Sequence, residues 1–222
     1  LNAAVAVTHP KVRRAVVTAM GEFRTKKAAT RLTERAREDE SLLVASSAAR
    51  ALGATRQPEA FEVLEQLLDR DSWADVLRAG ALGGLANLRD ERGVELIRQR
   101  TRYGIPNRGR RAAVMALAKL ASGRRAREHL EDMLSDADPY LRVTVVDAIA
   151  ELGDVRARAA LRRQLERDLD GRVRRRIRET LLNLSGRHRK EMRRLEDEVE
   201  RLERHVQELT VRITKLEAKK KV

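Results

Sequence analysis

The feature that most constrains this chain is a short unit that recurs every 32 or 33 residues. An apolar triplet of the Ala-Leu-Gly type closes each copy. The last residues of the triplets are Gly21, Gly53, Ala86, Ala118, Ala150 and Leu182, so the spacings are 32, 33, 32, 32 and 32. Within each copy the apolar residues lie three and four apart, which indicates helix. A fixed phase of this length predicts stacked units that bury their apolar faces against one another.

Each unit is predicted to contain two antiparallel helices. The triplets end the first set, and the second set lies between them over 25–38, 57–69, 90–102, 123–135 and 154–168. Asp138-Pro139 and Asp170-Gly171 are typical helix starts, because Asp accepts from free backbone N–H groups and Pro suits the first helical position. No segment with the period of a strand is long enough to compete. We therefore predict an all-α solenoid of about six repeats over residues 1–185.

An arginine recurs at one position of the unit, eight residues before the end of the triplet. The column consists of Arg13, Arg78, Arg110, Arg142 and Arg174, and the second copy has Ala45 instead. We expect the column to be structural, with each guanidinium pairing with a carboxylate or a loop carbonyl and tying successive turns together. A ligand-binding role is the alternative. The period, the Asp-Pro start and the closing triplet together resemble HEAT repeats.

Residues 186–222 are predicted to form a separate helix, from about 187 to 218, with a strict heptad pattern. The seam consists of Met192, Leu195, Val199, Leu202, Val206, Leu209, Ile213 and Leu216. Leucine at every d position and β-branched residues at most a positions favour a two-stranded coiled coil. A parallel homodimer would bring Glu198 to face Glu203, so three arrangements stay open: a different partner, an antiparallel pair, or a helix that folds back on its own solenoid.

The chain shows no catalytic, cofactor or metal-binding motif. It has no Cys, which excludes disulfides, thiolate zinc ligands and thiol nucleophiles. None of the four histidines belongs to an H-E-x-x-H motif; they are His9, His129, His188 and His205. His129 is expected at the surface. Gly80, Gly83 and Gly84 are followed by no Lys-Ser/Thr, so we expect a close helix contact there and no phosphate loop.

Positive charge is concentrated in two stretches. The chain carries 48 Lys and Arg against 34 Asp and Glu, a net charge of +14. Residues 96–127 hold ten of the basic residues and no acid, and residues 155–190 hold thirteen against four acids. Such a field can attract phosphates or acidic peptides. The alternatives are a solvated surface or one covered by another domain, and the scarcity of aromatics disfavours stacking of single-stranded bases.

The start of the sequence suggests a piece of a longer chain. Residue 1 is Leu1, and neither a signal peptide nor a membrane-spanning run of about 18 apolar residues is present. A soluble protein in the cytoplasm is the favoured expectation.

Four stretches carry a second resemblance: residues 71–82, 101–108, 110–114 and 168–176. With the heptad tail, they resemble the C-terminal helical-repeat region of bacterial zinc aminopeptidases of the aminopeptidase N family. In that family the zinc motif and the G-x-M-E-N substrate motif lie upstream, in a separate catalytic domain, and neither occurs in this sequence. The resemblance implies a non-catalytic domain that packs on the catalytic unit and helps enclose its substrate chamber, with zinc only in that unit. The alternatives are a stand-alone scaffold with a concave face for a protein partner, and a DNA-binding HEAT-like protein.

Overall fold

The computed structural model describes residues 9–220, with only the backbone described for 187–191, 196, 203, 208 and 210–220. Over this range the chain contains helices and no strand, which confirms the all-α prediction. The elements are α2 (Pro10–Met20), α3 (Lys26–Glu38), α4 (Leu42–Ala54), α5 (Ala60–Leu68), η1 (Trp73–Asp75), α6 (Val76–Leu88), α7 (Gly93–Gln99), α8 (Asn107–Leu120), α9 (Gly123–Asp132), η2 (Met133–Ser135), α10 (Pro139–Leu152), η3 (Val155–Ala157), α11 (Arg158–Arg167) and α12 (Gly171–Lys220).

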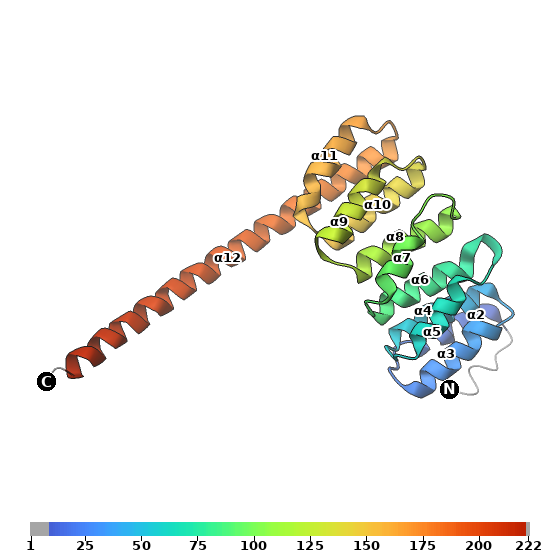
Figure 1. Cartoon of the computed structure of the whole chain (residues 1–222), viewed down its shortest axis with the longest axis horizontal. Helices are drawn as coiled ribbons and strands as arrows, with labels where there is room; N and C mark the ends of the chain where they lie inside the picture. The colour runs from blue at the N-terminus through green and yellow to red at the C-terminus, as the bar shows by residue number, and fades with distance from the viewer. Residues whose placement is uncertain (1–8, 221–222) are drawn as a thin grey trace.

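The helices stack in two layers (Figure 1). Layer A consists of α2, α4, α6, α8, α10 and the first part of α12, and each of these packs on the next. Layer B consists of α3, α5, α7, α9 and α11, whose members contact their layer-A partners more than one another. The described chain therefore contains five helix pairs, and α12 supplies the layer-A helix of a sixth unit.

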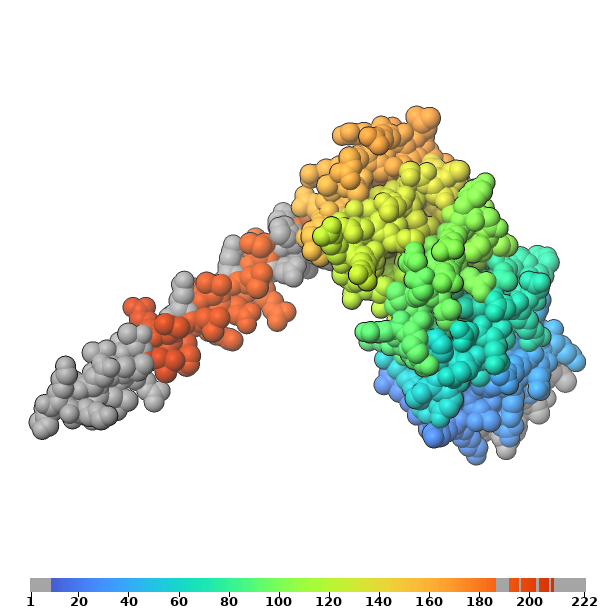
Figure 2. Space-filling model, in the orientation of Figure 1, coloured from blue at the N-terminus to red at the C-terminus, as the bar shows by residue number. Residues whose placement is uncertain are grey.

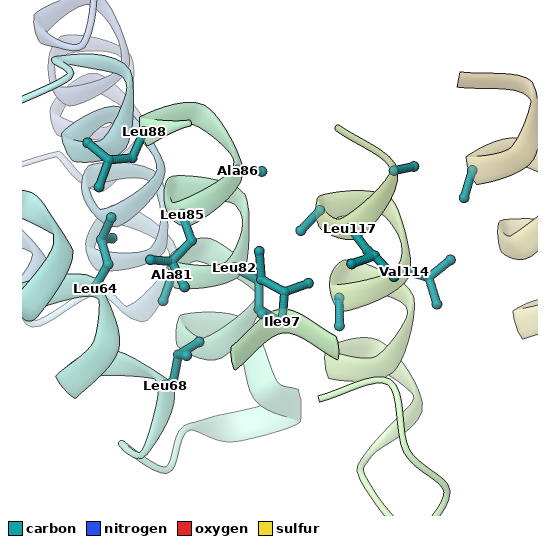
Figure 3. Close-up of a cluster of buried hydrophobic side chains, with 14 of the residues drawn as sticks. Leu64, Leu68, Ala81, Leu82, Leu85, Ala86, Leu88, Ile97, Val114 and Leu117 are labelled. Atoms are coloured by element: carbon teal, nitrogen blue, oxygen red, sulfur yellow. The ribbon is translucent and has the colours of Figure 1, made fainter. Parts of the chain in front are cut away.

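The core is one continuous seam of aliphatic side chains between the layers. Leu64 of α5, Leu82 of α6 and Leu130 of α9 are fully buried. Figure 3 shows Leu82 beside Ile97 of α7, in the space between α6 and α8. Burying one such side chain stabilises a fold by about 1.5–3 kcal/mol. Because neighbouring units share these residues, each unit depends on the next one for its core.

Glycines allow α4 and α6 to approach closely. A Cβ atom on Gly53 would lie 1.9 Å from the backbone oxygen of Gly84, and one on Gly84 would lie 2.5 Å from the oxygen of Ala49. A Cβ atom on Gly80 would lie 2.4 Å from the oxygen of Ser46. The expectation of a close helix contact at Gly80 and Gly84 is thus confirmed, since only glycine leaves room for the facing backbone.

The last solenoid helix and the heptad tail form one uninterrupted helix, α12. The predicted start at residue 187 is wrong, because the helix already begins at Gly171 and runs to Lys220. A single helical glycine such as Gly186 costs about 1 kcal/mol relative to alanine. That cost is too small to end a helix flanked by good helix formers. Val173 and Ile177, in the first part of α12, are fully buried in the core.

Beyond Gly186, α12 runs away from the solenoid (Figure 1). Its described side chains stand clear of the other helices on the face seen in Figure 2. Over the described residues, α12 therefore does not adopt the fold-back arrangement. No helix in the described range is both long enough and apolar enough to cross a membrane.

Candidate protein-interaction surfaces

Three arginines of the repeated column each form an ion pair with an aspartate that lies 26 residues further along the chain. Arg13 donates to Asp39 from Nε (3.0 Å) and from Nη2 (2.9 Å). Arg142 donates to Asp168 from Nε (2.8 Å) and from Nη2 (2.9 Å). Arg110 pairs with Asp136 and also donates from Nε to the backbone oxygen of Thr101 (3.1 Å). Such two-point pairs fix orientation as well as charge.

Each of these aspartates also fixes the loop that leads into the next layer-A helix. Its Oδ1 accepts the backbone N–H two residues on, at 2.9–3.0 Å; the donors are Ser41, Asp138 and Asp170. Arg142 donates to the backbone oxygen of Asp136 at 2.8 Å, so neighbouring pairs are linked. The arrangement joins adjacent units through loops and charges, and it lies inside the repeat rather than at an open binding site.

The other two arginines of the column are held differently. The residue 26 positions after Arg78 is Gly104, which offers no carboxylate. Arg78 instead donates from Nε to the backbone oxygen of Leu68 (2.7 Å) and pairs with Asp75. Arg174 forms no ion pair with any residue whose side chain the structure describes, and Arg176 pairs with Asp147 of α10.

Acid should weaken the fold through these aspartates. Burial raises the pKa of Asp39, Asp136 and Asp168, but hydrogen bonds from the paired arginine and from the backbone outweigh it, so each pKa lies below its ordinary value of 3.8. The stabilisation is present above that value and is lost as pH falls through the lowered pKa values. We expect the free energy of unfolding in urea to fall progressively as the pH drops below about 4. An Asp39→Asn variant should show a smaller fall, and equal falls in both proteins would contradict this origin.

His129 is partly buried and lines an open hollow on the surface, so its expected place at the surface is only qualified by partial burial. Its Nε2 lies 2.9 Å from Oγ1 of Thr101, which is itself buried after the end of α7. Burial lowers the pKa of His129, and Arg98 lowers it further, while Asp132 and Glu95 oppose the change. No group of three or more His, Asp or Glu side chains among the described residues could hold a metal ion.

A hollow of about 670 Å³ lies on the open face of layer A, and we call it the groove. Its floor is made of small and apolar residues of α6 and α8: Ala79, Gly83, Ala86, Ala112, Met115 and Ala116. The charged residues that also line it are four cations and one acid: Arg50, Arg108, Arg111, Lys119 and Glu151. Three of the cations come from the basic stretch 96–127, so part of that stretch faces this groove. The combination suits a ligand with both apolar and acidic groups.

The described part of the heptad seam is an open apolar stripe along α12. Met192, Leu195, Val199, Leu202, Val206 and Leu209 are each 41–61% exposed. Ile213 and Leu216 lie outside the residues whose side chains are described. A stripe of this length exposed on one helix is typical of an interaction surface. Self-association through it stays a prediction.

Replacing seam leucines by lysine should separate the subunits if the tail pairs. In Leu202→Lys/Leu209→Lys the charged ends could not enter a helix–helix seam. We expect the variant to sediment as a monomer, whereas the original chain sediments as an oligomer. Leu182→Lys is the control, because Leu182 lies on α12, is 73% exposed and falls outside the seam. An unchanged mass in the double variant would show that the seam is no intermolecular contact.

Comparison with known protein families matches HEAT repeats over residues 1–86 and 106–182. A comparison with curated proteins finds no match. Among solved structures, an engineered protein is 18% identical, with a TM-score of 0.47 over 83% of this chain and 94% of its own. The CpcE–CpcF complex of phycocyanin lyase from Nostoc is 16% identical, with a TM-score of 0.40 over 82% and 92%.

Human deoxyhypusine hydroxylase in complex with glycerol is 17% identical, with a TM-score of 0.34 over 82% of each chain. These scores are too low to support any argument about function. None of these three proteins is an aminopeptidase, so the aminopeptidase resemblance gains no support from them. The family match covers well over half of the sequence and agrees with the two-layered stack of helix pairs. The chain belongs to the HEAT-repeat family.

Proposed function

We propose that this protein is a non-catalytic scaffold that binds a segment of another protein, or of another domain of the same longer protein, in the groove on layer A. The observation that carries the proposal is the groove itself, with its apolar floor and its cationic surround. It is built on packed helices, so a bound segment need not order the site first. Stacked repeats offer extended surfaces of this kind. The buried arginine–aspartate pairs support the same function, because they keep the units in fixed relative positions.

A groove-filling substitution tests this proposal. A Cβ atom on Gly83 would meet Nε of Arg50 at 2.9 Å, the flexible end of a side chain, so Gly83→Arg should fold. The probe is a library of displayed peptides selected on the original protein. We expect Gly83→Arg to weaken binding of selected peptides by about tenfold or more, a loss of about 1.4 kcal/mol.

The matched control is Thr30→Arg, which adds the same charge at an exposed position of α3 in layer B. The control should bind the selected peptides as the original protein does. Selection of no peptides at all, or of peptides that bind both variants equally, would contradict the groove as the binding site.

As a finer proposal, we infer that the partner is the catalytic domain of a zinc aminopeptidase, carried by the same longer chain. Two stretches with that resemblance, 71–82 and 101–108, contain Trp73 and Tyr103 in the loops that enter layer A. The side chains of Trp73 and Tyr103 are 76% and 85% exposed, as expected for a surface that another domain covers. The coding sequence upstream should then encode an H-E-x-x-H domain, and these 222 residues alone should have no aminopeptidase activity.

A further inference from the structure

Three arginines from three successive units meet at one corner of the solenoid, where layer A turns into layer B. Arg24, Arg56 and Arg89 each stand three residues after the end of a triplet, so the repeat phase aligns them. With Lys119 they line a hollow of about 430 Å³ beside the groove. We call these four residues the cationic corner. Glu22 is the one acidic residue among the described residues that line it.

The three arginines of the cationic corner have no carboxylate partner among the described side chains, in contrast to other loop arginines of the chain. Elsewhere, Arg92 pairs with Asp90 and Arg156 pairs with Asp154. Arg24, Arg56 and Arg89 form no ion pair with a described side chain, and Lys119 donates to the amide oxygen of Asn87 at 2.6 Å. Desolvation lowers the pKa of Arg56, and the charges of Arg89 and Arg24 lower it further. Like charges are therefore held near one another with no ion pair between them and a described carboxylate, although Glu22 lines the same hollow.

The backbone of the corner is strained at two of its arginines. Arg56 and Arg89 have φ of 57° and 60°, in the left-handed region that disfavours side chains with a Cβ atom. The equivalent position in a later unit is Gly153, with φ of 71°. Glycine thus serves the same turn without strain. Strain of this kind clusters at functional sites.

The cationic corner adjoins the groove, and its row of arginines does not extend into the later units. Asn87 and Lys119 line both hollows, so the two are adjoining. At the next equivalent position along the stack stands Ala121, and beyond it Gly153. With helices about 8–10 Å apart, three arginines span about 20 Å. That is the length of about six residues of extended peptide.

We propose that the cationic corner binds a short run of Asp and Glu side chains in a partner segment whose apolar residues occupy the groove. The inference rests on the proposed scaffold function and names the chemistry of the partner. Guanidinium forks bind carboxylates at two points, which suits arginine better than lysine to this role. The short row and the apolar floor beside it favour a peptide over a nucleic-acid strand, which is the rival outcome of the test.

The test compares two variants that each lose two positive charges. Arg56→Gly/Arg89→Gly removes the corner charges and the backbone strain, and Arg162→Gln/Arg163→Gln removes two exposed arginines of α11. The probes are fluorescent octaglutamate and an oligothymidylate of equal charge. We expect the corner variant to bind octaglutamate about tenfold more weakly. The α11 variant should bind it within about twofold of the original.

Three results would overturn the inference. The first is equal weakening of octaglutamate binding in both variants. The second is tighter binding of oligothymidylate than of octaglutamate, with the oligothymidylate binding lost in the corner variant. The third is a lower Tm of the corner variant, which would assign the arginines to the fold. Peptides selected on the original protein distinguish failure of this inference from failure of the scaffold proposal. If they bind the corner variant unchanged but not Gly83→Arg, the acidic-partner inference fails and the groove remains the binding site.

Discussion

Gly53→Ala should destabilise the protein by about 2–3 kcal/mol, although the same substitution usually stabilises a helix. The added Cβ atom would lie 1.9 Å from the backbone oxygen of Gly84. Neither helix can yield locally, because both are packed on further helices of layer A. The spacing of α4 and α6 would have to increase, which opens the core on both sides. Urea unfolding followed by far-UV circular dichroism measures the effect.

Gly186→Ala is the matched control, since nothing lies within 4 Å of a Cβ atom built there. It removes the conformational freedom of glycine inside α12 and should raise helix stability by about 0.5–1 kcal/mol. The two glycines should therefore respond with opposite signs to one chemical change. Stabilisation by both substitutions would show that α4 and α6 do not depend on their close approach.

Asp168→Ala should cost about 3 kcal/mol, because it leaves the guanidinium of Arg142 without its partner. The Asp168 side chain is fully buried and accepts from Arg142, from Gln164 (2.8 Å) and from the backbone N–H of Asp170 (2.9 Å). Its loss removes the ion pair and the support of the loop before α12. A lower midpoint of urea unfolding with an unchanged slope is the expected observation.

The control for the buried pair is Asp71→Ala. Asp71 lies 3.5 Å from Arg78, but its side chain is fully exposed, so the substitution should cost less than about 0.5 kcal/mol. Similar losses in the two variants would mean that burial does not decide the strength of these pairs. Arg142→Met alone and combined with Asp168→Ala completes a double-mutant cycle that isolates the pair itself.

The repeat phase predicted the fold well because it reflects long-range packing directly. Apolar residues three and four apart can only be buried by neighbouring helices, so both the helices and their stacking follow from the pattern. Acidic residues recur in the same phase, which the arginine column alone does not show. Asp39, Asp136 and Asp168 recur 26 residues after Arg13, Arg110 and Arg142. Searching the phase for acids as well as arginines would have identified these partners.

Other features depend on coordinates that the pattern does not contain. Helix α12 begins earlier than the heptad pattern predicts, because no residue near Ser185 stops a helix. The change from the repeat pattern to the heptad pattern therefore does not coincide with a helix boundary. His129 lies against Thr101, which follows the end of α7 at Gln99, whereas the sequence predicted a helix that continues to residue 102. The groove is likewise a product of stacking and has no local sequence signature. The left-handed backbone at Arg56 is indicated only by the glycine at the equivalent position 153.

The unbroken course of α12 has a consequence for valency. From Gly186 to Lys220 the helix rises by about 50 Å at 1.5 Å per residue. If two copies join their tails in an antiparallel pair, arms of that length would hold the two solenoids at opposite ends of the joined helices. Such a pair would offer two distant sites at once, so a partner with two suitably separated segments would gain avidity, and a partner with one segment would gain none.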